Sequence, residues 1–139
     1  MTLDLATFAK EKGVKYFKRR QYKDARDAFL KSQLHIDKSH YSPDLTYKLG
    51  MSLFHLKDLD GAAMHLRRTL TFDHKKDTLN EITYHLAVAL DRLGRGGEAR
   101  SVYEDYANRF KYDERALEAQ KRVMQLNREG VDAEQNAPR

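Results

Sequence analysis

The sequence predicts an all-α fold, a right-handed α-solenoid of three helix-turn-helix hairpins followed by a C-terminal capping helix. Two observations lead to this prediction. Segments of the chain repeat at an interval of 36 to 37 residues, and apolar residues within each repeat recur at helical spacing. The composition agrees, because 34% of the residues are charged and only two are proline, as is typical of helical domains.

The repeat is clearest between residues 45–53 and residues 82–90, which align at an offset of 37 with most substitutions conserving size or polarity. One offset earlier, Phe8, Gly13 and Tyr16 belong to a more diverged first copy. Terminal repeats are commonly atypical in such arrays. We expect a single domain over residues 1–130, with repeats at about 6–39, 43–76 and 80–112.

Turn and capping signals divide each repeat into two helices. Turns are expected at residues 57–61 and 94–97, where glycine and aspartate cluster. Ser42 followed by Pro43 predicts a helix start in the second repeat. Thr78 and Glu81 have the spacing of a capping box and predict the start of the third.

Small residues recur where the two helices of a hairpin must approach closely. A glycine inside a helix costs about 1 kcal/mol relative to alanine, so its recurrence indicates a packing requirement. The expected close contacts involve Gly13, Gly50 and Ala87 on the first helices and Ala25, Ala62 and Ala99 on the second.

This order of small residues, turn, aromatic or leucine, and a closing Leu-x-[Ile/Phe]-Asp resembles the tetratricopeptide repeat over residues 6–112. The chain departs from that family in two ways. Ala9, Thr46 and Thr83 replace a large aromatic early in the first helix, and the proline that closes each unit is absent. The repeat is also longer than the usual ~34 residues, which is similar to stretched versions in bacterial envelope-assembly proteins.

A last helix is predicted over residues 113–129, with Asp113 as its N-cap and Gly130 at its end. Such a helix covers the exposed end of a repeat stack. Its expected apolar stripe is Ala116, Ala119, Val123 and Leu126. The polar residues 131–139 are expected to form a flexible tail.

No pattern in the sequence points to catalysis, a metal or a cofactor. The chain has no cysteine, and its six histidines form no H-E-x-x-H motif. Gly94–Gly97 lacks the Lys-Ser/Thr of a phosphate-binding loop. We therefore expect no catalytic residue, no metal ligand, no cofactor and no enzyme activity.

The resemblance implies a concave groove, lined by the first helix of each repeat, that holds a segment of another protein. Tyr47 and Tyr84 recur one repeat apart and suit peptide anchors; the alternative is that Tyr47, Tyr84 and Val88 pack between neighbouring repeats. The expected groove residues are Lys10, Val14, Phe17, Lys18, Tyr47, Met51, Phe54, His55, Tyr84, Val88, Asp91 and Arg92.

Some members of the family clamp the carboxylate of chaperone tails with a lysine and an asparagine. Lys10 matches the lysine of that clamp, but Val14 stands where the asparagine is needed. We therefore do not expect the carboxylate clamp in this chain.

The net charge of +5 is accompanied by a dense run of basic residues between Lys10 and Lys23. Besides the lysines already assigned to the groove, the run contains a basic patch of Lys15, Arg19, Arg20 and Lys23. This patch is either a dock for an acidic protein segment or a solvated helix face. Nucleic acid is the less favoured ligand, because no nucleic-acid-binding motif accompanies the charge.

The predicted function is a non-enzymatic adaptor or scaffold that binds a peptide segment of a partner protein. Two alternatives stay open, a small chaperone for a secretion or envelope-assembly client and an RNA-associated repeat protein. A homodimer through the uncapped N-terminal face is also left open. No apolar run approaches the ~20 residues that span a bilayer, and no secretory signal is present. Taken as a full gene product, the protein is expected in the cytoplasm.

Overall fold

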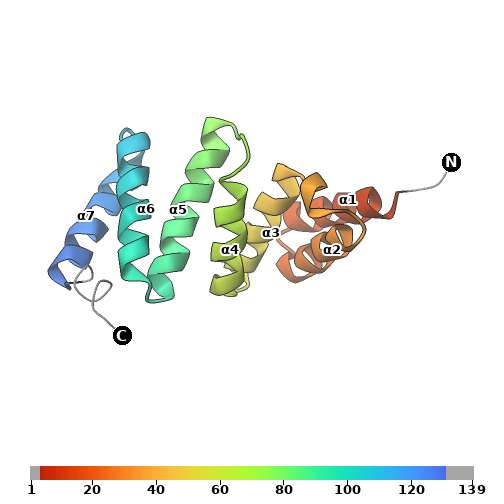
Figure 1. Cartoon of the computed structure of the whole chain (residues 1–139), viewed down its shortest axis with the longest axis horizontal. Coiled ribbons are helices and arrows are strands. Elements are labelled where there is room, and N and C mark those ends of the chain that lie inside the picture. Colours follow the sequence, from red (N-terminus) through yellow and green to blue (C-terminus); the bar gives the residue numbers. More distant parts are fainter. Residues whose placement is uncertain (1–3, 131–139) are drawn as a thin grey trace. The chain divides into compact units, whose positions relative to one another are not determined.

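The computed structural model describes residues 4–130, and its regular elements in this range are all helices (Figure 1). The chain divides into two compact units, Met1–Asp73 and His74–Arg139, which we describe separately. The single domain expected over residues 1–130 stays a prediction. The predicted tail, 131–139, lies outside the described residues.

Unit 1 contains two helical hairpins. The first consists of α1 (Leu5–Lys18) and α2 (Tyr22–Leu34), and the second of α3 (Pro43–His55) and α4 (Leu59–Thr69). A short 3₁₀ helix, η1 (Lys38–His40), lies between them. Each hairpin packs on itself, and α3 also contacts both α1 and α2.

Unit 2 contains the third hairpin and the last helix. The hairpin is α5 (Lys76–Arg92) with α6 (Gly96–Arg109), and α7 (Glu114–Arg128) packs against α6 (Figure 1). The three hairpins and the closing helix confirm the predicted helical-repeat fold. Ala116, Ala119 and Leu126 are buried in α7 as predicted.

The turns of the three hairpins share one backbone geometry. Arg20, Lys57 and Gly94, each 37 residues apart, have positive φ angles of 61°, 69° and 79°. In each turn the next residue donates its N–H to a carbonyl five residues earlier; in the first turn Gln21 donates to Tyr16 at 2.9 Å. This left-handed residue closes the helix by satisfying its last carbonyls. The predicted interval is thus repeated in the geometry of the backbone.

Close helix approach explains the small residues of the repeat. A Cβ atom added to Gly13 would lie 2.6 Å from the ring of Phe29, and one added to Gly50 would lie 2.9 Å from Leu66 Cδ2. Both of these partner side chains are fully buried. The facing alanines, Ala25, Ala62 and Ala99, are fully buried as well.

Two of the three predicted helix starts are confirmed. The Ser42 side chain accepts from Leu45 N at 3.0 Å ahead of Pro43, and Asp113 accepts from Arg115 N at 2.9 Å. The predicted capping box at Thr78 is wrong. Helix α5 begins at Lys76; its cap residue, Lys75, lies three residues before Thr78 and makes no side-chain capping bond. The extended backbone of Lys75 starts this helix without a sequence signal.

Candidate functional site

An aromatic cluster lies at one end of unit 1, where α1 and α3 end and α2 begins. The rings of Tyr22 and His55 stack, with centroids 4.2 Å apart and an interplanar angle of 16°. Phe17 meets Tyr22 edge to face at 5.8 Å. His55 is exposed, whereas Phe17 and Tyr22 are half-buried. The cluster therefore presents π faces and edges at the surface, supported by three helices.

Phe54 contacts this cluster from the core of unit 1. Its ring meets His55 edge to face at 5.8 Å, while its own side chain is buried. Met51, one turn earlier on α3, is buried as well. Both residues were predicted to line the groove, but the structure places them in the core, so these two side chains present almost no surface to a partner.

The other predicted groove residues of unit 1 remain accessible. Lys10, Val14 and Tyr47 are half-buried, and Lys18 is exposed beside Phe17. Because α1 and α3 contact each other, these residues belong to neighbouring helices of one unit.

The positive charge of the protein is concentrated next to this cluster. Residues 10–23 contain seven basic residues and a single acid, Glu11. Asp4 is the one other charged residue before residue 24, and the 19 basic and 19 acidic residues from there onward cancel. The net charge of +5 therefore arises from α1 and the turn into α2. The four residues of the predicted basic patch, Lys15, Arg19, Arg20 and Lys23, are all exposed.

In unit 2, Asp91, a predicted groove residue of α5, is held by the last helix. Arg122 of α7 binds Asp91 through two nitrogens, at 2.7 and 2.8 Å, and the Tyr103 hydroxyl donates to the same carboxylate at 3.1 Å. The hydrogen bond to Asp91 is the main cause that raises the pKa of Arg122. Burial, followed by the charge of Asp91, raises the pKa of Tyr103.

Tyr84 is also used inside unit 2. Its ring lies 4.6 Å from the guanidinium of Arg115 on α7 and 5.3 Å from the ring of Tyr106 on α6. These contacts favour the packing role that the sequence left open for Tyr84. Val88 is half-buried and Arg92 is exposed.

A polar network joins the starts of α5 and α7. Arg115 donates to Asn80 at 2.6 Å and to Glu81 at 2.9 Å. Asn80 in turn donates to Asp113 at 3.0 Å and accepts from the Tyr106 hydroxyl at 3.0 Å. The backbone N–H of Arg115 is the main cause that lowers the pKa of Asp113. The network fixes α7 on unit 2, and its chemistry is structural.

Solved structures with the same fold are tetratricopeptide-repeat (TPR) domains. The first TPR of Spaghetti (RPAP3), bound to the HSP90 peptide SRMEEVD, is 22% identical, covers 89% of this chain and 91% of its own, and superposes with a TM-score of 0.66. The TPR domain of Arabidopsis OM64 is 16% identical over 87% of this chain and 95% of its own, with a TM-score of 0.67. A TPR-like protein from Chlorobium tepidum is 20% identical over 88% and 94%, with a TM-score of 0.63.

The chain has the tetratricopeptide-repeat fold. Neither a protein-family model nor a curated protein sequence matches it. In this TPR fold, the first helices of the hairpins are α1, α3 and α5, which carry all the predicted groove residues.

Two histidines of the TPR hairpins have partners in the backbone of their own helices. His65 and His85 each place Nδ1 against the carbonyl four residues earlier, at 2.9 and 2.7 Å. Burial lowers the pKa of both imidazoles. Across residues 4–130, no three His, Asp or Glu side chains gather where they would hold a metal ion. In the same range no helix is long and apolar enough to cross a membrane.

Sequence analysis did not identify Tyr22, Arg115 or Arg122 as important for the site. Tyr22 occupies a repeat position with Leu59, so the pattern showed a packing residue and not its stacking on His55. The two arginines lie more than 30 residues from Glu81 and Asp91, and no periodic signal connects a charged pair at that separation.

Proposed function

We propose that the chain is a non-enzymatic protein-interaction module that binds a peptide segment of a partner protein on unit 1. The binding surface is the aromatic cluster of Phe17, Tyr22 and His55 together with Lys18 and the basic patch of Lys15, Arg19, Arg20 and Lys23. The chemistry of this surface favours an acidic peptide that carries an aromatic or aliphatic anchor.

The observation that carries this proposal is the coincidence of the aromatic cluster with the net charge. Lys18 follows Phe17 directly and Lys23 follows Tyr22, and both lysines are exposed, so two cations are next to the aromatic cluster in the sequence. Aromatic side chains provide contact area at low entropic cost, and a one-sign field accelerates the encounter with a ligand of opposite charge. Lys10, Val14 and Tyr47 extend the proposed surface along α1 and α3.

A TPR neighbour bound to a peptide supports the same use of the fold. The peptide in that structure, SRMEEVD, contains three acidic residues. Val14 argues against a lysine–asparagine clamp in this chain, because its side chain cannot donate a hydrogen bond to a carboxylate. We therefore assign recognition to the aromatic cluster and to distributed positive charge.

The test is fluorescence anisotropy with an array of labelled acidic peptides, each paired with a copy in which the acids are replaced by glutamine. The acidic peptides should bind the wild-type chain, and the glutamine copies should bind at least about tenfold more weakly. His55→Ala should weaken binding by removing the stacked ring. Lys18→Glu with Lys23→Glu should weaken it further and flatten its dependence on salt.

The matched control is Lys38→Glu with Lys111→Glu, which makes the same charge change at two exposed positions outside the cluster and the basic patch. If both double variants lost affinity equally, the effect would come from net charge alone, and the assigned surface would be contradicted. A labelled single-stranded RNA that binds more tightly than every peptide would favour the RNA-associated alternative. A single client that copurifies in fixed proportion would favour the chaperone alternative.

A further inference from the structure

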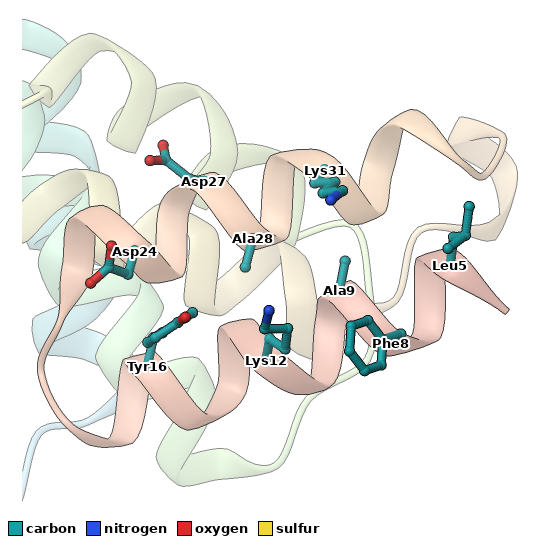
Figure 2. Close-up of a pocket in the computed structure, with 9 residues that line it drawn as sticks. All are labelled: Leu5, Phe8, Ala9, Lys12, Tyr16, Asp24, Asp27, Ala28 and Lys31. Atoms are coloured by element: carbon teal, nitrogen blue, oxygen red, sulfur yellow. The ribbon is translucent and has the colours of Figure 1, made fainter. Parts of the chain in front are cut away.

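The hairpin of α1 and α2 has a hollow of about 320 Å³, and all the residues that line it belong to these two helices. Figure 2 shows the side chains that line it along both helices. From α1 come Leu5, Phe8, Ala9, Lys12 and Tyr16, and from α2 come Asp24, Asp27, Ala28 and Lys31.

The apolar part of this face is exposed and lies on α1. Leu5 is 56% exposed and Phe8 is 44% exposed. Lys12 lies over the Phe8 ring at 5.4 Å and does not bury it. On α2, Ala28 lies across the hollow from Lys12, and its small side chain leaves the hollow open (Figure 2).

The charges of the face are separated between its two helices. The α1 edge carries a cation, Lys12, and the α2 edge carries two acids, Asp24 and Asp27, with Lys31 at its far end. Asp27 is also paired with Arg26 at 3.0 Å, in an exposed ion pair. A ligand that carries charge of one sign is attracted to one edge of such a face and repelled by the other. A second copy of the same face is attracted at both edges, because the α1 edge of each copy meets the α2 edge of the other.

We propose that this face is the contact between two copies of the chain, related by a two-fold axis that runs parallel to α1 and α2. In a contact of this kind each residue pair occurs twice. The axis places α1 of one copy on α2 of the other and keeps every residue at its height along the hairpin. This inference is independent of the proposed peptide surface.

Two pairs of residues then meet across the axis. Within one hairpin, Lys12 lies across the hollow from Ala28, and Phe8 lies across from Lys31 (Figure 2). After the rotation, Lys12 of one copy meets the Asp27–Ala28 segment of the other, which forms an ion pair. Phe8 meets Lys31 of the other copy, whose ammonium and aliphatic stem suit the face of an aromatic ring.

A dimer of this kind would link two peptide surfaces. Two binding sites held together raise the avidity for a partner that displays more than one segment, without any new contact.

The test is sedimentation velocity of the full chain over a wide range of concentration. The wild-type chain should pass from monomer to dimer as concentration rises. Lys12→Glu and Asp27→Lys should each weaken the dimer about tenfold or more, because each places like charges together twice. Phe8→Gln should weaken it as well. Lys38→Glu, an exposed change of the same charge on another segment, should leave it intact.

Mixing the Lys12→Glu chain with the Asp27→Lys chain gives the decisive result. Each variant repels itself, but a mixed pair carries one native and one reversed ion pair, so a dimer should reappear on mixing. A wild-type chain that stays monomeric throughout would overturn the proposal and leave the face to another occupant, such as an amphipathic helix of a different protein. The proposal would also be overturned if the substitutions did not weaken the dimer, or if mixing the two variants did not restore it. Circular dichroism establishes that each variant is folded.

Discussion

Arg122 of α7 holds Asp91 of α5 through two hydrogen bonds of 2.7 and 2.8 Å. A two-nitrogen arginine–carboxylate contact is among the stronger polar contacts in proteins. It joins two helices that no short-range pattern connects. It also changes the role of Asp91, which was predicted to face a partner and instead holds the last helix of its own unit.

Asp91→Ala should therefore destabilise the protein. The change leaves Arg122 and the Tyr103 hydroxyl without their shared acceptor, at a cost of about 1–3 kcal/mol. Urea unfolding measures the loss, and the double variant with Arg122→Ala should recover part of it. Asp105→Ala is the control, because its ion pair with Arg109 is half exposed on both sides and should be worth at most about 1 kcal/mol. Equal effects at the two positions would contradict the structural role of Asp91.

Gly13→Ala tests the closest helix contact of the first hairpin. The new Cβ would lie 2.6 Å from the ring of Phe29, a fully buried side chain that has little freedom to move. Overpacking of this kind costs about 1–3 kcal/mol, against about 1 kcal/mol gained from helix propensity. The net effect on the free energy of unfolding should be a loss. Gly50→Ala should cost less, because its new Cβ would lie 2.9 Å from Leu66 Cδ2, a less severe overlap than the 2.6 Å at Gly13. A Gly13→Ala chain more stable than the wild type would show that Phe29 can move aside.

The sequence predicted those features that the repeat copies locally. The interval of 37 residues located the hairpin turns, and the small residues Gly13 and Gly50 marked the close approaches. It did not locate the start of α5, because Lys75 makes no capping bond. It also did not separate groove from core on α3. Met51 and Phe54 lie on the same helix as the accessible Tyr47 and His55, and side-chain spacing alone does not fix which of them neighbouring helices cover.

Reciprocal substitutions in two equivalent turns should change stability in opposite directions. Gly94 has a φ of 79°, and no described atom lies within 4 Å of a Cβ placed there. Gly94→Ala therefore tests backbone strain alone and should cost about 1–2 kcal/mol. Lys57 has a φ of 69° at the same place in the second turn. Lys57→Gly removes that strain but increases the conformational entropy of the unfolded chain. We therefore expect the free energy of unfolding to rise by between zero and about 1 kcal/mol. A destabilised Lys57→Gly chain with an unaffected Gly94→Ala chain would contradict the shared geometry.

The buried histidines should make the protein less stable in mild acid. Burial is the main cause that lowers the pKa of His65 and His85 below the ordinary 6.5. Above that value both imidazoles are neutral in the folded and unfolded states, so neither contributes a pH dependence. As the pH falls through 6.5, these two imidazoles bind protons in the unfolded chain but not yet in the folded chain. The free energy of unfolding therefore falls until the pH reaches the pKa of the imidazoles in the folded state. Urea midpoints measured between pH 7.5 and pH 5 should decrease in the wild type. In a His65→Gln, His85→Gln chain the slope should flatten, even if the midpoint at neutral pH is lower, because the neutral amides bind no proton in this range. An unchanged slope in that variant would assign the acid sensitivity to other groups.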